Sequence, residues 1–322
     1  MRKADFNAAL EQGQQLAAAA ASVGPETSPL LAFYALVQIG RAVAAASVRL
    51  TNSEWQGSGH GLACPDLDGV ADRGIATLTL QGSTGSNSHY IAARALDGPP
   101  LLSPTTFGVL WSLLQLDEVV LPGSGPSADV LQVRAVGGWT GNSDPDARIY
   151  PILEGAPRRP GARSARRAAE RLPWTPELER TYPRIASLRV EDDRPYVQYS
   201  LRGELLRQDA VLQVALREDI SSTEAFRRVT STYRGYSYVL PAIDESGTQA
   251  HPFLVWWEVL YALSRLARYK PREWLRLIDV SRHPDAAAIE LGLLTVITSM
   301  PEIAFDALSR AADEDITRPA SG

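Results

Sequence analysis

The chain has 322 residues, of which 45% are hydrophobic and 21% are charged, and its formal net charge at pH 7 is -5. This composition excludes a disordered or fibrous protein, and the small net charge excludes a molecule-wide positive field that would attract nucleic acid or a membrane. Cys64 is the only cysteine, which excludes an internal disulfide and a zinc site built from several thiolates.

The first 28 residues favour an alanine-rich soluble helix. Their opening charges are typical of a signal peptide, but Glu11 and the glutamines around it interrupt the apolar region that a signal peptide needs. No segment reaches the roughly 18 to 20 uninterrupted apolar residues of a membrane-spanning helix. We therefore expect a soluble, cytoplasmic protein that does not bind a membrane.

A long apolar helix is predicted to begin at Ser28, in the segment TSPLLAFYALVQIGRAVAAASVRL. Ser28 can cap the free backbone donors of the first turn, and Pro29 suits the first helical position. Apolar and small residues recur along this segment at steps of three and four, namely Leu30, Phe33, Val37, Gly40 and Ala44. This pattern predicts a helix that packs closely against another helix.

The segment GSGHGL, residues 57–62, places His60 between two glycines directly after this helix. An imidazole with a pKa near 6.5 can exchange a proton at neutral pH, and glycines let a phosphate or a ribose approach the backbone. His60 is therefore a candidate catalytic residue. The alternative is a tight turn at Gly59 and Gly61, in which His60 hydrogen-bonds a carbonyl of the neighbouring helix.

Two polar residues of the long helix form a second candidate. Tyr34 and Arg41 lie two helical turns apart and share a face. Together they could hold a phosphate, with the arginine donating two hydrogen bonds and the tyrosine one. A salt bridge across a helix interface is the alternative role for this pair.

Short strands are expected in the middle of the chain. GIATLTLQ at 74–81 predicts a strand, residues 104–116 predict a short helix, and DVLQVRAV is a β-like run between 122 and 153. Farther on, IASLRV and PYVQYSL predict a hairpin about residues 191–193. Residues 205–217 predict a helix and YRGYSYVLP another strand.

Arginines concentrate between residues 155 and 171, where proline and glycine interrupt the run and mark a boundary. This segment could contact RNA or DNA phosphates through its arginines, which include Arg158, Arg159, Arg163, Arg166 and Arg167. No aromatic residue for base stacking lies inside the run. A solvated loop is therefore the alternative.

The last third is predicted to be helical, with two helices broken at Pro271 and two more broken at Pro301. A polar stripe follows one face of the first of these helices and consists of Glu258, Tyr261, Arg265 and Arg268. Arg265 and Arg268 are candidates to face a cleft, meet the His60 loop and bind phosphate. The alternative is a solvated helix face on which Glu258 offsets Arg265.

Several standard chemistries lack their motifs. The sequence has no P-loop with its lysine, no dinucleotide fingerprint, no histidine pair at metal spacing and no Gly-x-Ser-x-Gly elbow. We therefore expect no cofactor and no bound metal.

AFYALVQIGRAVAAAS followed by GHGL, together with YALSRLARYKPREWLRLI near the C-terminus, resembles the YaaC-like proteins, a bacterial family. The second motif is the more specific, because its order of Leu-Ser, Arg-Tyr, Pro and Trp is unusual. The resemblance extends over most of the chain outside the arginine-rich segment. It implies a fold and no particular activity.

The N-terminal part also resembles the HEPN helical domains, in which a phenylalanine-tyrosine-alanine helix is followed by a loop and a histidine. That resemblance implies a ribonuclease or a nucleotide-binding accessory module of defence systems, and a homodimer. Active members carry an arginine four to six residues before the histidine. Here ten residues separate Arg49 from His60, and Arg282 lies directly beside His283, which disfavours the ribonuclease.

The expected fold is α+β and mostly helical. A HEPN-like helical lobe with short strands is predicted at 1–150, an arginine-rich linker at 151–173, and a strand hairpin with a C-terminal helical lobe at 174–322. The expected function is a non-enzymatic interaction or accessory module in a bacterial defence or stress system, binding a protein, a second copy or nucleic acid. The alternative is an RNA- or nucleotide-directed hydrolase that uses His60 with an arginine.

Overall fold

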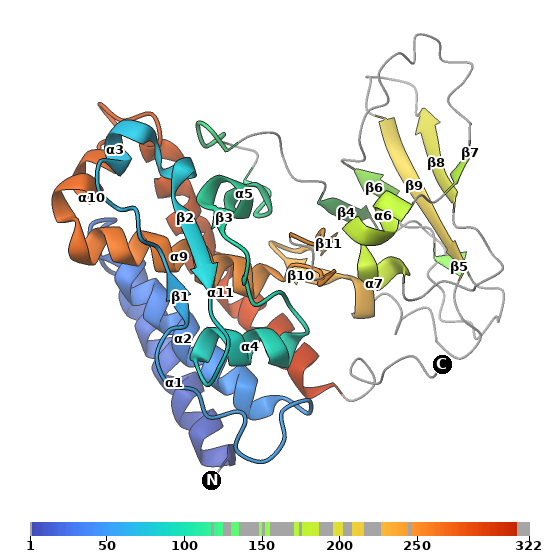
Figure 1. Ribbon diagram of the computed structural model, residues 1–322, viewed down its shortest axis with the longest axis horizontal. Coiled ribbons are helices and arrows are strands. Elements are labelled where there is room, and N and C mark those ends of the chain that lie inside the picture. The colour runs from blue at the N-terminus through green and yellow to red at the C-terminus, as the bar shows by residue number, and fades with distance from the viewer. Residues whose placement is uncertain are drawn as a thin grey trace. The chain divides into compact units, whose positions relative to one another are not determined.

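The computed structural model describes residues 2–116, 119–124, 130–134, 148–149, 152–154, 171–173, 176–186, 196–201, 208–215, 227–243 and 247–313. The chain folds into two compact units (Figure 1). Unit 1 comprises residues 1–128 and 250–317, and unit 2 comprises 129–249 and 318–322. The N-terminal and C-terminal helices therefore belong to one unit, and unit 2 lies between them in sequence.

The division expected from composition stays a prediction. Most of the predicted linker at 151–173, namely residues 155–170, lies outside the described residues, and so do all five arginines proposed to contact nucleic acid. The boundaries between the two compact units fall after residue 128 and before residue 250.

Unit 1 is built around the helix at residues 28–46. The long helices of the unit are α1 (Arg2–Ala21), α2 (Ser28–Ala46), α9 (Pro252–Tyr269) and α11 (Ala286–Ala312), and α10 (Pro271–Leu277) follows α9. Helix α2 packs against α1, α9 and α11, and also against α4 (Ser88–Leu96). The predicted helix from Ser28 is confirmed, but its cap is not Ser28, which is already helical: Thr27 precedes it and makes no side-chain cap bond.

Small residues let these helices approach closely, as the sequence predicts. A Cβ atom at Gly40 of α2 would lie 2.1 Å from the Trp257 ring of α9, and one at Gly13 of α1 would lie 2.8 Å from the Ile39 side chain. The Trp257 side chain is fully buried. Only glycine at position 40 therefore allows this contact between α2 and α9.

A small antiparallel sheet accompanies the helices of unit 1, in the order β1 (Leu62–Ala63), β2 (Thr79–Gly82) and β3 (Thr105–Thr106). The predicted strand at 74–81 is partly wrong, because a 3-10 turn at Ile75–Thr77 precedes β2. The predicted helix at 104–116 is shorter, α5 (Phe107–Ser112), because Thr105 and Thr106 pair with β2 and the Thr106 hydroxyl caps the helix. A short helix α3 (Val70–Arg73) completes the unit.

Proline acts differently at its two predicted breaks. The break at Pro271 is confirmed, since α9 ends at Tyr269 and α10 begins at Pro271. The break predicted at Pro301 is wrong, because α11 continues through it. The hydroxyls of Thr298 and Ser299 donate to helix carbonyls one turn earlier, and buried residues line α11 on both sides of the proline. This packing outweighs the cost of the missing N–H.

Unit 2 contains an antiparallel sheet in the order β10-β11-β4-β6-β9-β8-β7, and β5 also pairs with β9. Its strands are β4 (Leu131–Arg134), β5 (Arg148–Ile149), β6 (Ile152–Glu154), β7 (Arg171–Pro173), β8 (Tyr196–Leu201), β9 (Gln208–Ala215), β10 (Ser231–Tyr233) and β11 (Tyr236–Val239). Two short helices follow β7, α6 (Pro176–Thr181) and α7 (Pro183–Ala186).

Strands predicted in unit 2 are partly confirmed. PYVQYSL and YRGYSYVLP contain β8 and β11, and DVLQVRAV contains β4. The helix predicted at 205–217 is wrong: Gln208–Ala215 is β9 and pairs with β8 from Leu201↔Gln208 to Tyr196↔Gln213. Within IASLRV, Ile185 and Ala186 belong to α7, and the remainder lies outside the described residues.

The described part of the chain is mostly helical with short antiparallel strands, which confirms the predicted fold class. Among these residues, α2 and α11 have the length and apolar composition to cross a bilayer. Most of the apolar window of each is buried inside unit 1, 67% for α2 and 56% for α11. Core helices of globular proteins share that length and composition.

Candidate functional site

The GSGHGL segment uses its backbone to cap the start of α4. The carbonyl oxygens of Gly59 and His60 accept hydrogen bonds from the backbone N–H groups of Ser88 and His89, at 3.2 and 3.4 Å. Gly59 and Gly61 have positive φ angles of 72° and 78°, as the predicted tight turn requires. The turn is therefore structural in its main chain, which leaves the His60 side chain for another role.

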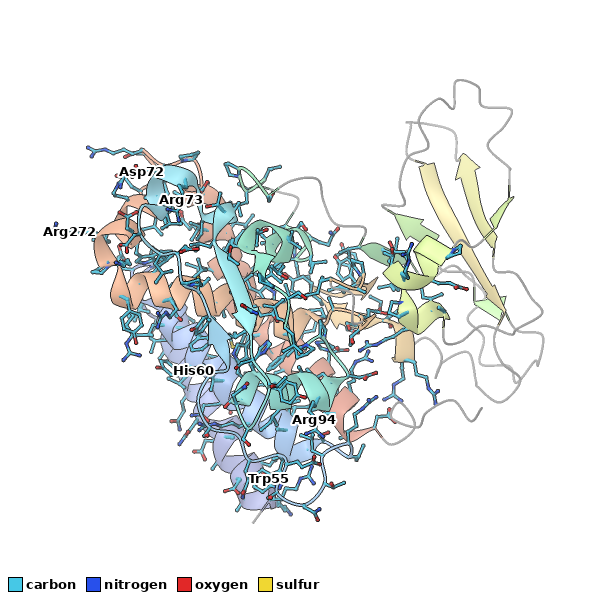
Figure 2. All side chains as sticks on the ribbon, viewed as in Figure 1. Trp55, His60, Asp72, Arg73, Arg94 and Arg272 are labelled. Atoms are coloured by element: carbon cyan, nitrogen blue, oxygen red, sulfur yellow. The ribbon has the colours of Figure 1, made fainter. Side chains whose placement is uncertain are left out.

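The His60 imidazole lies among aromatic rings and is half-buried. Its centroid is 5.2 Å from that of Phe33, 5.9 Å from Tyr34 and 6.4 Å from Tyr261. The ring makes no hydrogen bond to a helix carbonyl in the described structure, and its Nδ1 is buried without a partner. The expectation of a carbonyl-bonded histidine is thus wrong at the side chain. Figure 2 labels His60 on the segment that leads from α2 to β1.

Two arginines of α9 lie beside this histidine. Arg268 Nη1 donates to the Tyr34 hydroxyl at 3.3 Å, which links α9 to α2. The guanidinium carbons of Arg265 and Arg268 lie 4.4 and 5.0 Å from the centre of the Tyr269 ring. The hydrogen bond to Tyr34 therefore places Arg268 at the side of α2 that carries Tyr34, and the shared contact with Tyr269 keeps Arg265 close to Arg268.

Arg41 joins the group from two turns farther along α2. It is exposed, and its Nη1 donates to Gln38 Oε1 at 3.4 Å. We refer to Tyr34, Arg41, His60, Arg265 and Arg268 as the arginine–histidine cluster. The sequence named all five as candidates, and the structure brings them together. Tyr269 was missed, although its spacing of four from Arg265 on one helix face was a usable signal.

The arginine–histidine cluster carries a positive charge. Burial of the ring, followed by the charges of Arg41, Arg268 and Arg265, lowers the pKa of His60 below its ordinary value of 6.5. None of these three arginines forms an ion pair with a carboxylate among the described residues. The cluster therefore presents three uncompensated guanidinium groups around a neutral imidazole at pH 7.

The other half of the predicted polar stripe is structural. Glu258 is fully buried and its Oε1 lies 3.0 Å from His89 Nε2, so it does not offset Arg265 as predicted. The Tyr261 hydroxyl donates to the carbonyl of Leu62 at 2.6 Å and fixes β1 to α9. Burial raises the pKa of this phenol. Burial also raises the pKa of the nearby Cys64 thiol to about 11, so Cys64 is not a ready nucleophile.

The remaining arginine–histidine neighbours do not form a site. Arg49 pairs with Asp97 at 3.3 Å, and Arg282 with Asp279 at 3.7 Å. His283 Nε2 lies 2.8 Å from the carbonyl oxygen of Ala71. These groups hold loops together and lie outside the cluster.

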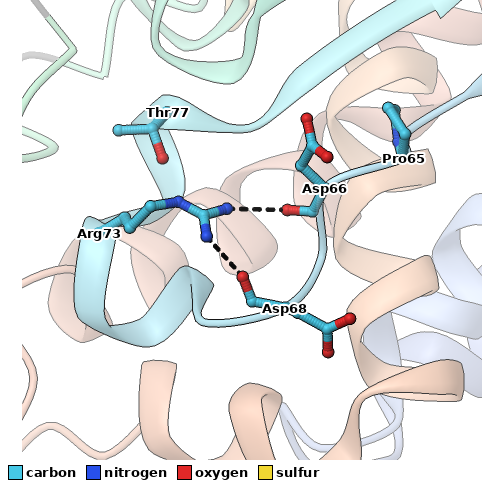
Figure 3. A pocket seen from close by; sticks show the side chains of 5 residues that line it. All are labelled: Pro65, Asp66, Asp68, Arg73 and Thr77. Carbon is cyan, nitrogen blue, oxygen red and sulfur yellow. Dashed lines mark hydrogen bonds between the residues drawn. The ribbon is translucent and has the colours of Figure 1, made fainter.

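A cavity of about 260 Å³ lies on the segment that follows β1, lined by Pro65, Asp66, Asp68, Arg73 and Thr77 (Figure 3). Arg73 points across it and donates to the main-chain carbonyls of Asp66 and Asp68. The Asp68 carboxylate pairs with Lys270. Arg73 and the Asp68 carboxylate are therefore engaged in holding the turn, and we assign no ligand to this cavity. The described residues also hold no group of three or more metal-ligating side chains.

Comparison with known proteins gives one finding. No curated protein and no solved structure matches the chain. The family model described as YaaC-like Protein matches residues 2–68 and 167–308, which include the GSGHGL segment, α9 and α10. The likeness to HEPN domains stays a prediction. The chain belongs to the YaaC-like protein family.

Proposed function

We propose that unit 1 is a binding module for a phosphate-bearing ligand of the nucleotide or nucleic-acid class, held at the arginine–histidine cluster. The observation that carries this proposal is the group of three arginines without a carboxylate partner around one imidazole. Arginine presents a rigid fork of donors that matches phosphate oxygens. The cluster thus offers the charge and the hydrogen-bond donors that a phosphate needs.

Aromatic side chains favour a nucleotide over a simple inorganic anion. Tyr34 is half-buried at the cluster, and Tyr269 is 48% exposed beside Arg265 and Arg268. Aromatic rings and guanidinium planes are the groups on which nucleobases stack. A ligand that carries both a phosphate and a base therefore fits this surface better than either part alone.

In this proposal the protein is a non-enzymatic accessory component of a bacterial defence or stress system. Ligand binding at the cluster would report a nucleotide or RNA signal to a partner protein or to a second copy of the chain. The arginines at 158–167 would add a separate, salt-dependent contact with RNA or DNA.

A second candidate, a hydrolase, is favoured by the state of His60. A neutral imidazole can accept a proton from an attacking hydroxyl, and an arginine can stabilise the charge of the phosphate in the transition state. His60→Ala separates the candidates. A hydrolase cleaves a labelled RNA and loses this turnover in the variant, whereas a binding module binds the RNA without cleaving it in either protein.

The test is a binding titration of the full chain with single-stranded RNA and with ATP, comparing wild type with Arg265→Gln/Arg268→Gln. A charge-assisted hydrogen bond contributes about 1.5–3 kcal/mol, so we expect the double variant to bind at least about tenfold more weakly. Arg282→Gln is the matched control, because Arg282 is exposed and pairs with Asp279 away from the cluster. Equal affinity of a folded double variant and the wild type would contradict the proposal.

A further inference from the structure

The charge at the arginine–histidine cluster exceeds what one internal phosphate of a nucleic acid neutralises. Arg41, Arg265 and Arg268 all act on His60, and none has a carboxylate partner among the described residues. A phosphodiester carries one negative charge and two free oxygens. A terminal phosphate monoester carries about two charges at pH 7 and three free oxygens.

The arginines are also held close to one another. Arg265 and Arg268 pack on the same Tyr269 ring, at 4.4 and 5.0 Å from its centre. Two like charges on one ring repel each other, and no carboxylate of the described structure relieves them. A dianion bound between them would relieve this repulsion more than a monoanion.

Unused donors of the cluster also favour a ligand with several oxygens. His60 Nδ1 and Arg265 Nε are buried and have no hydrogen-bond partner. Arg265 Nε always carries a hydrogen and is a donor, and the neutral His60 ring donates from Nδ1 in the tautomer that protonates this nitrogen. Leaving a buried donor unsatisfied costs about 1–3 kcal/mol. The two sides of the cluster come from α2 and α9, which the Arg268–Tyr34 hydrogen bond connects. Donors therefore converge from two helices, as the three oxygens of a terminal phosphate require.

From these observations, and resting on the proposed function, we propose that Tyr34, Arg41, His60, Arg265 and Arg268 recognise the terminal phosphate monoester of a nucleotide or oligonucleotide. An internal phosphodiester is not the recognised group. The ligand of this protein is then the phosphorylated end of an RNA or DNA strand, or a mononucleotide with that group.

Isothermal titration calorimetry of the full chain with three RNA octamers of one sequence tests this proposal. The first octamer has a 5′-phosphate, the second a 3′-phosphate, and the third a hydroxyl at both ends, so that all share the same internal phosphates. We expect at least one phosphorylated octamer to bind tenfold or more tightly than the third. AMP should likewise bind tenfold or more tightly than adenosine.

Variants assign the effect to the cluster. The preference for the terminal phosphate should disappear in Arg265→Gln, recover in part in Arg265→Lys, which keeps the charge and loses the fork, and persist in Arg282→Gln. Circular dichroism establishes that each variant is folded. If Arg265→Gln does not fold, Arg268→Gln, at an exposed side chain, takes its place.

The outcomes separate this inference from the proposed function. Equal binding of all three octamers, weakened equally by Arg265→Gln, overturns recognition of a terminal phosphate and leaves phosphate binding at the cluster intact. No binding of RNA octamers, AMP or ATP by the wild type overturns the proposed function itself.

Discussion

At the scale of single residues, His60 connects the family motif to the chemistry of the molecule. The glycines on either side give it a tight turn, and burial of its ring, together with Arg41 of α2 and Arg268 and Arg265 of α9, lowers its pKa. Glycine, histidine and arginine were each visible in the sequence. Their proximity in space was not visible, because α2 and α9 are separated by about 200 residues and only packing brings the two helices together.

The protonation of His60 gives the first prediction. Positive neighbours disfavour the imidazolium ion, so Arg265→Gln or Arg268→Gln should raise the pKa of His60. The change is measurable by NMR titration of histidine-labelled protein, with His60→Ala to assign the signal among four histidines. Arg282→Gln should leave the value unchanged. A pKa that stays constant in both cluster variants would show that these arginines do not act on His60.

The lowered pKa of His60 also makes the stability of the folded protein depend on pH. The pKa of His60 in the folded protein lies below its ordinary value of 6.5, so the unfolded chain binds this proton more tightly. The contribution of His60 to the free energy of unfolding is therefore complete above pH 6.5 and is lost as the pH falls through the folded-state pKa. His60→Gln should reduce the loss of stability between pH 7 and pH 5, as followed by urea unfolding at each pH.

The buried pair of His89 and Glu258 gives a further prediction at this scale. Glu258→Ala removes one partner of a buried hydrogen bond at 3.0 Å and leaves His89 without it. Breaking a buried pair costs about 3–5 kcal/mol, so we expect a loss of this size in the free energy of unfolding from urea titration. Glu54→Ala, which removes an exposed ion pair with Arg94, should have a much smaller effect. Equal losses would mean that burial does not govern the energy of these pairs.

At the scale of elements, the accuracy of each predicted helix or strand depended on how many residues its hydrophobic pattern covered. The long apolar periods of α2 and α9 were enough to predict these helices, since many residues agree on one face. The short segment that became β9 was predicted as a helix. Eight residues with an apolar run do not distinguish the two structures, and pairing with β8 and β6 decides for the strand.

Close packing of α2 on α9 gives a prediction at this scale. Gly40→Ala places a methyl group where the Trp257 ring lies, 2.1 Å from the Cβ position, so α2 and α9 must separate. Overpacking of a core costs about 1–3 kcal/mol, which we expect in the free energy of unfolding. Gly13→Ala is the matched control, because its new methyl group meets the smaller Ile39 side chain at the longer distance of 2.8 Å.

Gly13→Ala should cost less than Gly40→Ala, because a smaller displacement relieves its contact and alanine favours both helices equally. Urea unfolding of both variants compares them directly. A Gly40→Ala protein as stable as the wild type would mean that α9 can shift away from α2 without loss of packing.

At the scale of the whole molecule, unit 1 is assembled from both ends of the chain. Helix α2 packs on α9 and α11, which follow it only after unit 2. Residues 1–128 expressed alone should therefore lack a cooperative thermal transition, because the apolar face of α2 would stay exposed. Co-expression with residues 250–317 should restore the transition and yield a complex that purifies together. A sharp transition for residues 1–128 alone would contradict this assembly.

The sequence by itself determined the elements with long periods, the glycine turn around His60, the five residue types of the arginine–histidine cluster and the family to which they belong. These features depend on neighbouring residues, so local spacing is sufficient to recognise them. Only the tertiary structure decided that Arg268 contacts Tyr34, that Arg265 and Arg268 both act on His60, that Glu258 pairs with His89, and that α11 continues through Pro301. Each of these outcomes depends on contacts or burial contributed by distant parts of the chain. The local hydrophobic pattern of a segment does not predict such packing.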